Sequence, residues 1–391
     1  MAAENVMPVW QYRRSVRMQL MLSVCITSLG NYDWMKKQRF VSGGIALIHL
    51  AVPLAVSVSS SAVSANAQVN AQQDWHMRAG AAADYLDRQW GTDSGWSASE
   101  NWQRFPIVDA LIEYQRRTGD LRWEGKINAA VRNRSGLYLN DDDLWAVIAN
   151  VHAWQIEHDP ELLAWAATNY RRIVTEYWDE LCGGGLWWDR KRTYKNAIVN
   201  ELLIYASTQL YLATRQEPYR EWALRSWSWF ASSTMIGADG LVNDGLDARC
   251  GNNGAPRFTY NQGVLLGGLN DLSEITGDPQ FRALAVKTAL AATRTLVTTD
   301  GLLTEPFDGL GRDGPMFKGI FAFHVGHLIG VMPAGAERAE LRDWTRRNGE
   351  AVWRLTGEGS RPIDGLWTGG SDQHGAAAQA SGLEILLAAA S

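Results

Sequence analysis

The chain has 391 residues, 46% of them hydrophobic and 20% charged, so it can build one large domain or two ordinary ones around a sizeable core. Its formal net charge of −5 gives no electrostatic reason to expect a nucleic-acid partner. The 19 tryptophans, several of them beside glycine as in Gly95-Trp96, are an unusual feature. Flat apolar faces with a polar edge suit both core packing and sugar rings, and both uses stay open.

Residues 1–67 have the features of an N-terminal extension with a secretory signal peptide. An apolar run at 44–58 is too short to span a bilayer comfortably, and a basic segment at 36–39 precedes it. The motif Ala65-Asn66-Ala67 fits a signal-peptidase site. We therefore expect translation to start at Met35, cleavage after Ala67, secretion, and no stable membrane insertion. Residues 1–34 are then an over-extension of the reading frame or an unusually long basic leader.

Residues 68–391 carry a net charge of −9, because the first 67 residues hold six basic and two acidic side chains. The cysteines in this part are Cys182 and Cys250, and an even pair in an exported protein predicts a disulfide. Two free thiols are the alternative. No linker rich in proline or serine interrupts residues 75–391, so we expect 68–391 to form a single domain.

Apolar spacing along this part is helical almost throughout and predicts twelve helices. Their predicted ranges are 75–89, 106–117, 121–133, 141–157, 161–178, 194–214, 218–235, 259–275, 279–298, 316–331, 335–356 and 374–389. Amphipathic helices alternate with helices that are apolar nearly all round. Short turns lead out of the apolar helices, and long segments rich in Gly, Trp and Asn lead into them. This repeat predicts an all-α protein, an (α/α)6 toroid of six helical hairpins with the apolar helices inside.

In such a toroid the N-termini of the inner helices meet at one end. Four of these N-termini carry polar and aromatic side chains, namely Asp141 and Asp142, then Tyr194, Lys195 and Asn196, then Tyr260, Asn261 and Gln262, then Phe317 and Lys318. A helix cap explains one such cluster, but it does not explain four with aromatic residues interleaved. We therefore expect these side chains to surround one active-site cavity.

The segment Asn140-Asp141-Asp142-Asp143 places three consecutive carboxylates before a buried helix. Asparagine and aspartate are favoured at helix starts, so capping is one interpretation. Close carboxylates also raise each other's pKa, and glycoside hydrolysis needs one ionised and one protonated carboxyl. Neighbours in the first turn of a helix point about 100° apart, so two of them can face the same cavity.

Other chemistries find little support. His324 and His327 lie three residues apart on a predicted helix, but no further metal-binding motif accompanies them, so we expect core histidines. The glycines of 263–269 lack dinucleotide-binding spacing and predict close helix packing instead. We expect no metal and no cofactor.

Six segments together resemble glycoside hydrolase family 76, the endo-α-1,6-mannanases and their transglycosidase relatives. They are NDDDLWAVIA (140–149), CGGGLWWD (182–189), KNAIVNELL (195–203), GLVNDGLD (240–247), YNQGVLLGGL (260–269) and FKGIF (317–321). The resemblance implies an (α/α)6 fold and retaining hydrolysis within α-1,6-mannan chains. It places Asp141 as the nucleophile and Asp142 as the acid/base. Asp143 departs from the family pattern, so the pair Asp142/Asp143 remains an alternative register.

The resemblance also implies that Asp244 holds the sugar in the reactive subsite; a turn aspartate is the alternative. Further predicted substrate-binding residues are Asn196, Asn200, Tyr260, Asn261 and Lys318 as hydroxyl ligands and Trp187 and Trp188 as stacking platforms, each of which also fits a structural role. The expected partner is a polysaccharide of the α-1,6-mannan type, bound by a monomer. A cell-wall transglycosidase and a non-catalytic glycan-binding toroid are the alternative functions. A glycosidase or lyase acting on acidic sugars is disfavoured by the net charge.

Overall fold

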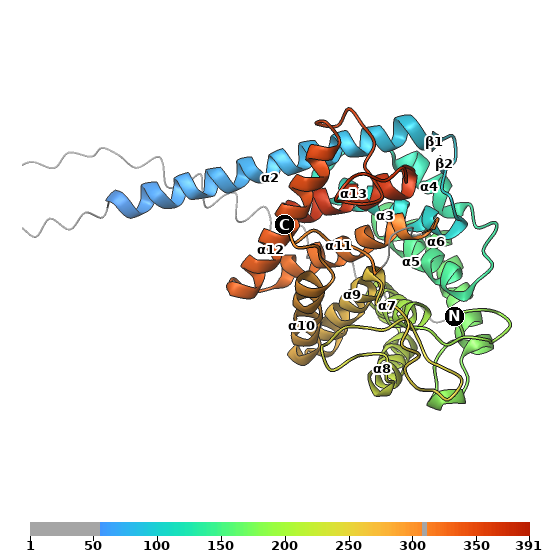
Figure 1. Ribbon diagram of the computed structural model, residues 1–391. Coiled ribbons are helices and arrows are strands. Elements are labelled where there is room, and N and C mark those ends of the chain that lie inside the picture. The colour runs from blue at the N-terminus through green and yellow to red at the C-terminus, as the bar shows by residue number, and fades with distance from the viewer. Residues whose placement is uncertain (1–54, 307–310) are drawn as a thin grey trace, which may run out of the picture. The chain divides into compact units, whose positions relative to one another are not determined.

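A computed structural model describes residues 55–306 and 311–391, and the fold discussed below is that of Val58–Ser391. The predicted start at Met35 and most of the apolar run at 44–58 lie outside the described residues. The described residues contain twelve helices, which alternate between an outer and an inner set (Figure 1). The outer helices are α2 (Ala55–Trp90), α4 (Glu124–Arg132), α6 (Pro160–Tyr177), α8 (Glu217–Ser232), α10 (Pro279–Thr295) and α12 (Ala336–Leu355). The inner helices are α3 (Arg104–Thr118), α5 (Asn140–Glu157), α7 (Ala197–Thr214), α9 (Thr259–Thr276), α11 (Gly314–Val331) and α13 (Ala376–Ala389).

The inner helices form a closed ring. Each contacts the next in chain order from α3 to α13, and α13 returns to α3. Helices α7, α9, α11 and α13 are buried almost along their whole length, whereas α6, α8 and α12 bury one face. The predicted (α/α)6 toroid of six hairpins is therefore confirmed, and the apolar character of the inner helices follows from their being covered on all sides.

Short turns with a common chemistry connect inner helices to outer ones. The Asp159 carboxylate accepts a hydrogen bond from the Glu161 N–H (2.9 Å) at the start of α6, and Pro160 occupies the first helical position. The Asp278 carboxylate does the same for the Gln280 N–H (2.9 Å) at the start of α10. An aspartate cap followed by proline satisfies exposed N–H groups and fixes the backbone for helix entry.

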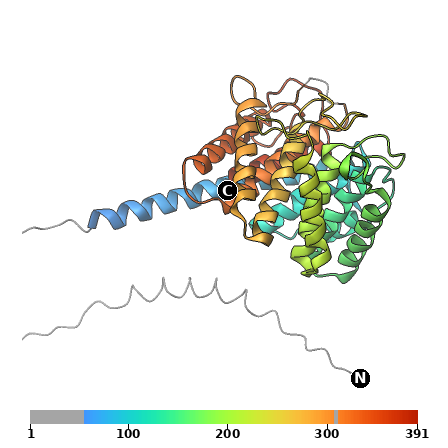
Figure 2. The same ribbon diagram turned by 90° about the horizontal axis from the view of Figure 1, so that it is seen from below.

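The long connections lie at the opposite end, where the inner helices begin; several of them appear in yellow to orange in Figure 2. They contain little regular structure. β1 (Gly91–Thr92) and β2 (Gly95–Trp96) form a two-stranded antiparallel sheet, and η1 (Asn101–Gln103) and η2 (Leu181–Gly183) are short 3-10 helices. Single bridges, such as Asn196 with Gly245, tie these connections to one another.

Three helix starts differ from the prediction by three residues or more, and one of them is α4, which begins at Glu124 rather than at 121. Helix α7 begins at Ala197 rather than at 194, because Asn196 is the N-cap, with an extended backbone and a side chain that accepts from the Val199 N–H. Helix α2 begins at Ala55 rather than at 75, since residues 55–74 contain no glycine or proline to interrupt it. The predicted cleavage site at 65–67 lies within this helix. Among the described residues, no helix combines the length and the apolar character that a membrane crossing requires.

The glycines of 263–269 pack inner helices closely, as the sequence indicated. A Cβ atom on Gly263 of α9 would lie 2.6 Å from the Phe321 Cα of α11, and one on Gly319 of α11 would lie 2.4 Å from the Ser381 Cα of α13. Since these neighbours are backbone atoms, a methyl group cannot be accommodated by a change of rotamer.

Gly263→Ala is therefore expected to lower the free energy of unfolding by about 2 kcal/mol or more, because the backbones of α9 and α11 must separate. Gly330→Ala in α11 is the matched control, since a Cβ there meets nothing within 4 Å; its effect should stay within about 0.5 kcal/mol or be stabilising. Urea unfolding followed by circular dichroism measures both. Equal effects of the two substitutions would contradict the packing argument.

Candidate active site

A cavity of about 450 Å³ opens at the end of the ring where the inner helices begin. Its lining is aromatic and acidic, and no lysine, arginine or histidine of the described chain contributes to it. The lining residues are Glu100, Asn101, Trp102, Gly136, Tyr138, Leu139, Asp141, Asp142, Trp145, Trp188, Tyr194, Asn196, Asp244, Phe258, Tyr260, Asp313 and Phe317. All four predicted clusters thus contribute to one cavity, although not with every residue.

The start of α5 holds Asp142 by the backbone. Leu139 is extended (φ −110°, ψ 163°) and precedes the first helical residue. The Asp142 Oδ2 accepts from the N–H groups of Tyr138 (2.9 Å) and Leu139 (3.2 Å). This is the return bond of an acid in the first helical turn, so Asp142 caps the helix and faces the cavity at once. The capping and active-site interpretations are therefore compatible.

Asp141 and Asp142 share one environment and influence each other's pKa. Removal from bulk water raises the pKa of Asp141 well above its ordinary value, and the adjacent Asp142 charge raises it further; a hydrogen bond from Trp188 opposes both. Burial also raises the pKa of Asp142, opposed by the two backbone N–H groups. The pair therefore retains one shared proton at a pH where an ordinary aspartate is ionised. Without a ligand, the deeper burial of Asp141 favours the charge on Asp142.

Asp143 is turned away from the cavity. Its Oδ2 pairs with Arg172 of α6 (2.7 Å) and with Arg190 of the connection between α6 and α7 (3.0 Å). These two charge-assisted contacts join Asp143 to both segments and stabilise their packing. The geometry therefore favours the register Asp141/Asp142 over Asp142/Asp143.

Asp244 lines the wall beside α7 and α9. Its Oδ2 accepts from the Tyr194 hydroxyl (2.8 Å), and its Oδ1 from the Asn261 amide (3.3 Å). Burial raises the pKa of Asp244, while these two hydrogen bonds lower it. Below it, Glu201 of α7 is fully buried without a hydrogen-bond partner, and burial together with the Asp244 charge raises the pKa of Glu201 well above its ordinary value. Burial and the nearby Asp244 charge both favour the protonated form of Glu201.

Backbone hydrogen bonds join three segments of this wall. The Asn140 N–H and side-chain amide donate to the carbonyls of Trp188 (3.0 Å) and Trp187 (2.8 Å). The Trp188 N–H donates to the Tyr194 carbonyl (2.8 Å), and the Ala197 N–H to the Asp244 carbonyl (2.7 Å). The start of α5 is therefore fastened to the segments that carry Trp188 and Asp244.

Four predicted substrate-binding residues do not line the cavity. The Asn200 side-chain oxygen accepts from the Leu186 N–H (2.7 Å), and its amide group donates to the carbonyls of Leu186 (3.2 Å) and Asn196 (2.8 Å). Trp187 donates to Asp179 (2.6 Å), and Asn261 supports Asp244. Lys318 is buried in the core without a hydrogen-bond partner, and its pKa is lowered by burial. In the structure these four side chains contact neighbouring protein groups instead of lining the cavity, and their role in sugar binding stays a prediction.

Asp313 and Trp102 were not singled out from the sequence. Asp313 is the N-cap residue of α11, and its Oδ1 accepts from the Trp102 indole (2.6 Å). The rule that inner-helix N-termini converge applies to both, since Asp313 immediately precedes α11 and Trp102 lies just before α3. Phe317, which packs parallel to Tyr260 with ring centroids 3.9 Å apart, completes this side of the cavity.

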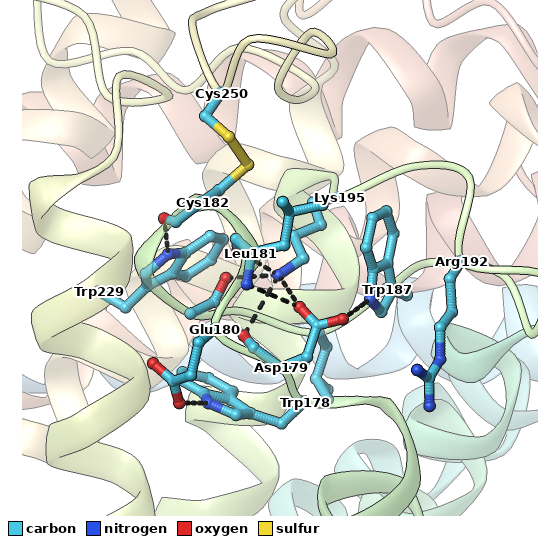
Figure 3. A network of polar contacts seen from close by, with 12 residues as sticks. Trp178, Asp179, Glu180, Leu181, Cys182, Trp187, Arg192, Lys195, Trp229 and Cys250 are labelled. Carbon is cyan, nitrogen blue, oxygen red and sulfur yellow. Dashed lines mark hydrogen bonds and ion pairs between the residues drawn. A yellow bond between two sulfur atoms is a disulfide. The ribbon is translucent and has the colours of Figure 1, made fainter.

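Lys195 holds together the connection that carries Trp188 (Figure 3). Its ammonium group donates to the Asp179 carboxylate (2.7 Å) and to the carbonyls of Leu181 (2.5 Å) and Gly184 (2.7 Å). The structure forms the disulfide between Cys182 and Cys250, which links this connection to the one that carries Asp244. Among the described residues, no group of three or more His, Cys, Asp or Glu side chains is arranged to hold a metal ion.

A ring of six helical hairpins that surrounds a cavity lined by carboxyls and aromatic rings suits an enzyme acting on sugars. Residues 72–390 match the family model of glycosyl hydrolase family 76, and the chain belongs to that family.

Individual relatives are distant. The chain is 26% identical to the mannan endo-1,6-alpha-mannosidase DCW1 of Saccharomyces cerevisiae, over 65% of this chain and 61% of that protein, so it spans less than two thirds of this relative's length. An inactive variant of the alpha-1,6-mannanase GH76A of Salegentibacter sp. HEL1_6, in complex with alpha-1,6-mannotriose, superposes with a TM-score of 0.73 at 23% identity, covering 81% of this chain and 99% of that one. Dfg5 of Chaetomium thermophilum, in complex with glucosamine, gives a TM-score of 0.67 at 19% identity, covering 81% and 89%.

Lys195→Met is expected to lower the free energy of unfolding by about 2–3 kcal/mol, because it leaves the buried carbonyls and Asp179 without their donor. Lys191→Met in the same connection is the control, since Lys191 is exposed and should tolerate the change. Guanidinium unfolding of both variants measures the difference. A Lys195→Met protein as stable as the control would show that the lysine does not hold the connection.

Proposed function

We propose that this protein is a secreted, retaining endo-α-1,6-mannanase that acts as a monomer on α-1,6-linked mannan. The observation that carries the proposal is the position of Asp141 and Asp142, side by side at the start of α5 in a cavity lined by aromatic rings. Retaining glycosidases need two carboxyls close together, one as nucleophile and one as acid/base. Asp143 is already neutralised by Arg172 and Arg190, which leaves Asp141 and Asp142 as the reacting pair.

In the proposed first step, Asp141 attacks C1 of the mannosyl unit while Asp142 gives its proton to the departing glycosidic oxygen. The C1–O bond breaks, and a glycosyl-Asp141 ester forms. In the second step Asp142, now ionised, takes a proton from water, whose oxygen displaces Asp141 from C1. The glycosidic oxygen accepts a hydrogen bond only from a protonated Asp142, so a bound substrate selects the microstate with the charge on Asp141.

Relatives support the substrate assignment. The yeast relative is named a mannan endo-1,6-alpha-mannosidase. The Salegentibacter mannanase was made inactive by replacing two consecutive aspartates with asparagine, and that variant is in complex with alpha-1,6-mannotriose. Two consecutive aspartates occupy the cavity here as well. The signal-peptide features of residues 1–67 and the disulfide support secretion, since disulfides persist in oxidising compartments.

Replacing each carboxyl assigns its role. With α-1,6-mannan, Asp141→Asn and Asp142→Asn are each expected to lower activity by about a thousandfold or more. α-1,6-Mannobiosyl fluoride has a leaving group that needs no acid, so added azide should restore product formation in both alanine variants but give different products. Asp141→Ala should yield the β-azide by direct displacement, and Asp142→Ala should yield the α-azide through the glycosyl-enzyme. NMR of the products measures the anomeric configuration.

Asp143→Asn is the matched control for these variants. It should lower stability, because two arginines lose their charged partner, but keep activity within about tenfold of the wild type. An α-azide from Asp143→Ala, together with a β-azide from Asp142→Ala, would move the reacting pair by one residue. A wild type inactive on both substrates would refute the proposed function.

The Trp188 hydrogen bond predicts a change in the pH profile. Asp141 has to be ionised for attack, so activity is lost as the pH falls through its pKa, and the Trp188 donor lowers that pKa. Trp188→Phe should therefore move the acid limb of kcat/KM to higher pH, by about half a unit to one unit. Initial rates with the fluoride from pH 3 to 8 measure it, with Trp187→Phe as the control because its indole donates to Asp179. An unchanged acid limb in Trp188→Phe would exclude this role.

A further inference from the structure

The carboxyl pair lies between two walls of the cavity that differ in construction. Asp141 lies on the side of Trp188, Asp244 and the disulfide-linked connections, since the preceding Asn140 donates to the Trp188 and Trp187 carbonyls (3.0 and 2.8 Å) and Trp188 donates to the Asp141 carboxyl. Asp142 faces the other side: its Oδ2 accepts from the Tyr138 and Leu139 N–H groups, and the segment that leads to them contacts the start of α3, where Arg104 donates to the Ser135 carbonyl (2.6 Å). Each member of the pair is therefore associated with its own wall.

If the proposed function holds, the two walls bind the two sugars on either side of the bond that is cleaved. The acid/base gives its proton to the oxygen of the departing sugar, so that sugar lies next to Asp142. The sugar that becomes attached to the enzyme lies next to Asp141. The wall beside Asp142 therefore faces the leaving sugar in the first step and any incoming acceptor in the second.

Trp102 forms a fixed aromatic surface on this wall. Its indole N–H donates to the Asp313 Oδ1 (2.6 Å), and its ring stacks on Trp145 with centroids 5.8 Å apart and an interplanar angle of 28°. Phe317 contacts it from a third direction, with centroids 6.3 Å apart. The ring is nevertheless only partly buried and lines the cavity. A large ring held in one orientation but left uncovered offers a flat face to a pyranose.

Asp313 supplies a polar group beside this ring. One carboxylate oxygen is engaged by Trp102, and no group of the described chain donates to the other, Oδ2. Glu100 lies on the same wall, where Arg312 pairs with it at 3.3 Å. Carboxylates accept hydrogen bonds from hydroxyl groups and repel anions. The wall therefore suits a neutral sugar and disfavours a uronic acid or a phosphorylated sugar.

We infer that Trp102 and Asp313 form the subsite for the leaving and acceptor sugar, with a neutral pyranose stacked on Trp102 and one of its hydroxyls donating to the Asp313 Oδ2. In the second step this sugar replaces water. Its hydroxyl proton goes to Asp142, its oxygen bonds to C1, and the bond between C1 and Asp141 breaks. The same subsite then controls the choice between hydrolysis and transfer.

Two substrates that share the enzyme-bound half separate this subsite from the rest of the cavity. α-1,6-Mannotetraose cleaved in its middle and α-1,6-mannobiosyl fluoride both form the mannobiosyl-enzyme, but the fluoride puts no sugar beside Asp142. Trp102→Ala and Asp313→Asn should each lower kcat/KM for the tetraose by about tenfold or more and for the fluoride by less than about threefold. Retained activity on the fluoride also shows that the variants are folded.

Transfer gives a second readout. With the fluoride as donor and α-1,6-mannobiose as acceptor, both variants should form less tetraose relative to hydrolysed mannobiose than the wild type does. Trp222→Ala, a partly exposed tryptophan of α8 outside the cavity, is the control and should change neither ratio. Asp244→Asn should lower kcat/KM for the tetraose and for the fluoride by similar factors.

Equal losses on the tetraose and the fluoride in Trp102→Ala and Asp313→Asn, with an unchanged transfer ratio, would overturn the inference while leaving the proposed function intact. A wild type that cleaves neither substrate would overturn the proposed function and the subsite with it. An acceptor preference for a sugar acid over mannobiose would contradict the neutral-sugar assignment.

Discussion

Two neighbouring carboxyls have to be kept out of bulk water at the start of α5, in a cavity to which the described chain contributes no cationic side chain. Desolvating them is costly, and their mutual repulsion adds to the cost. The positive end of the helix, the N–H groups of Tyr138 and Leu139, and the Trp188 indole partly offset it. The remaining cost appears as raised pKa values, which is the property that acid/base chemistry near neutral pH needs.

The run of three aspartates is tolerated because helical rotation separates their environments. Asp143 points to the outer layer and binds Arg172 and Arg190, so it joins α5 to α6 and to the connection after α6. Removing its charge from the cavity matters, because a third ionised group facing Asp142 would raise the cost of the pair further. The same rotation leaves the other two side chains facing inward.

The sequence predicted all twelve described helices and their alternation, because helical periodicity and connection length both follow from burial. It also located the cavity, since every contributing cluster lies where an inner helix begins. It was less successful within each cluster. Phe317 faces the cavity while Lys318 turns into the core, and Tyr194 and Asn196 line it while Lys195 lies beneath. Neighbouring residues differ by about 100° in direction, and the composition of a cluster does not say which of them faces inward.

The two walls of the cavity also differ in the number and kind of contacts that fix them to the rest of the protein. This difference affects which residues can be substituted without disturbing the site. The wall with Asp244 and Trp188 is fixed by backbone hydrogen bonds, by Lys195 and by the disulfide, so a substitution there disturbs several segments. The wall with Trp102 and Asp313 brings together two distant parts of the chain, joined there by side-chain contacts: the Trp102–Asp313 and Gln103–Arg312 hydrogen bonds and the Arg312–Glu100 ion pair. It can therefore vary without loss of the reacting pair. In the proposed mechanism water and sugar compete for the position beside Asp142, so we expect a change from hydrolysis to transfer to need alterations on that wall only.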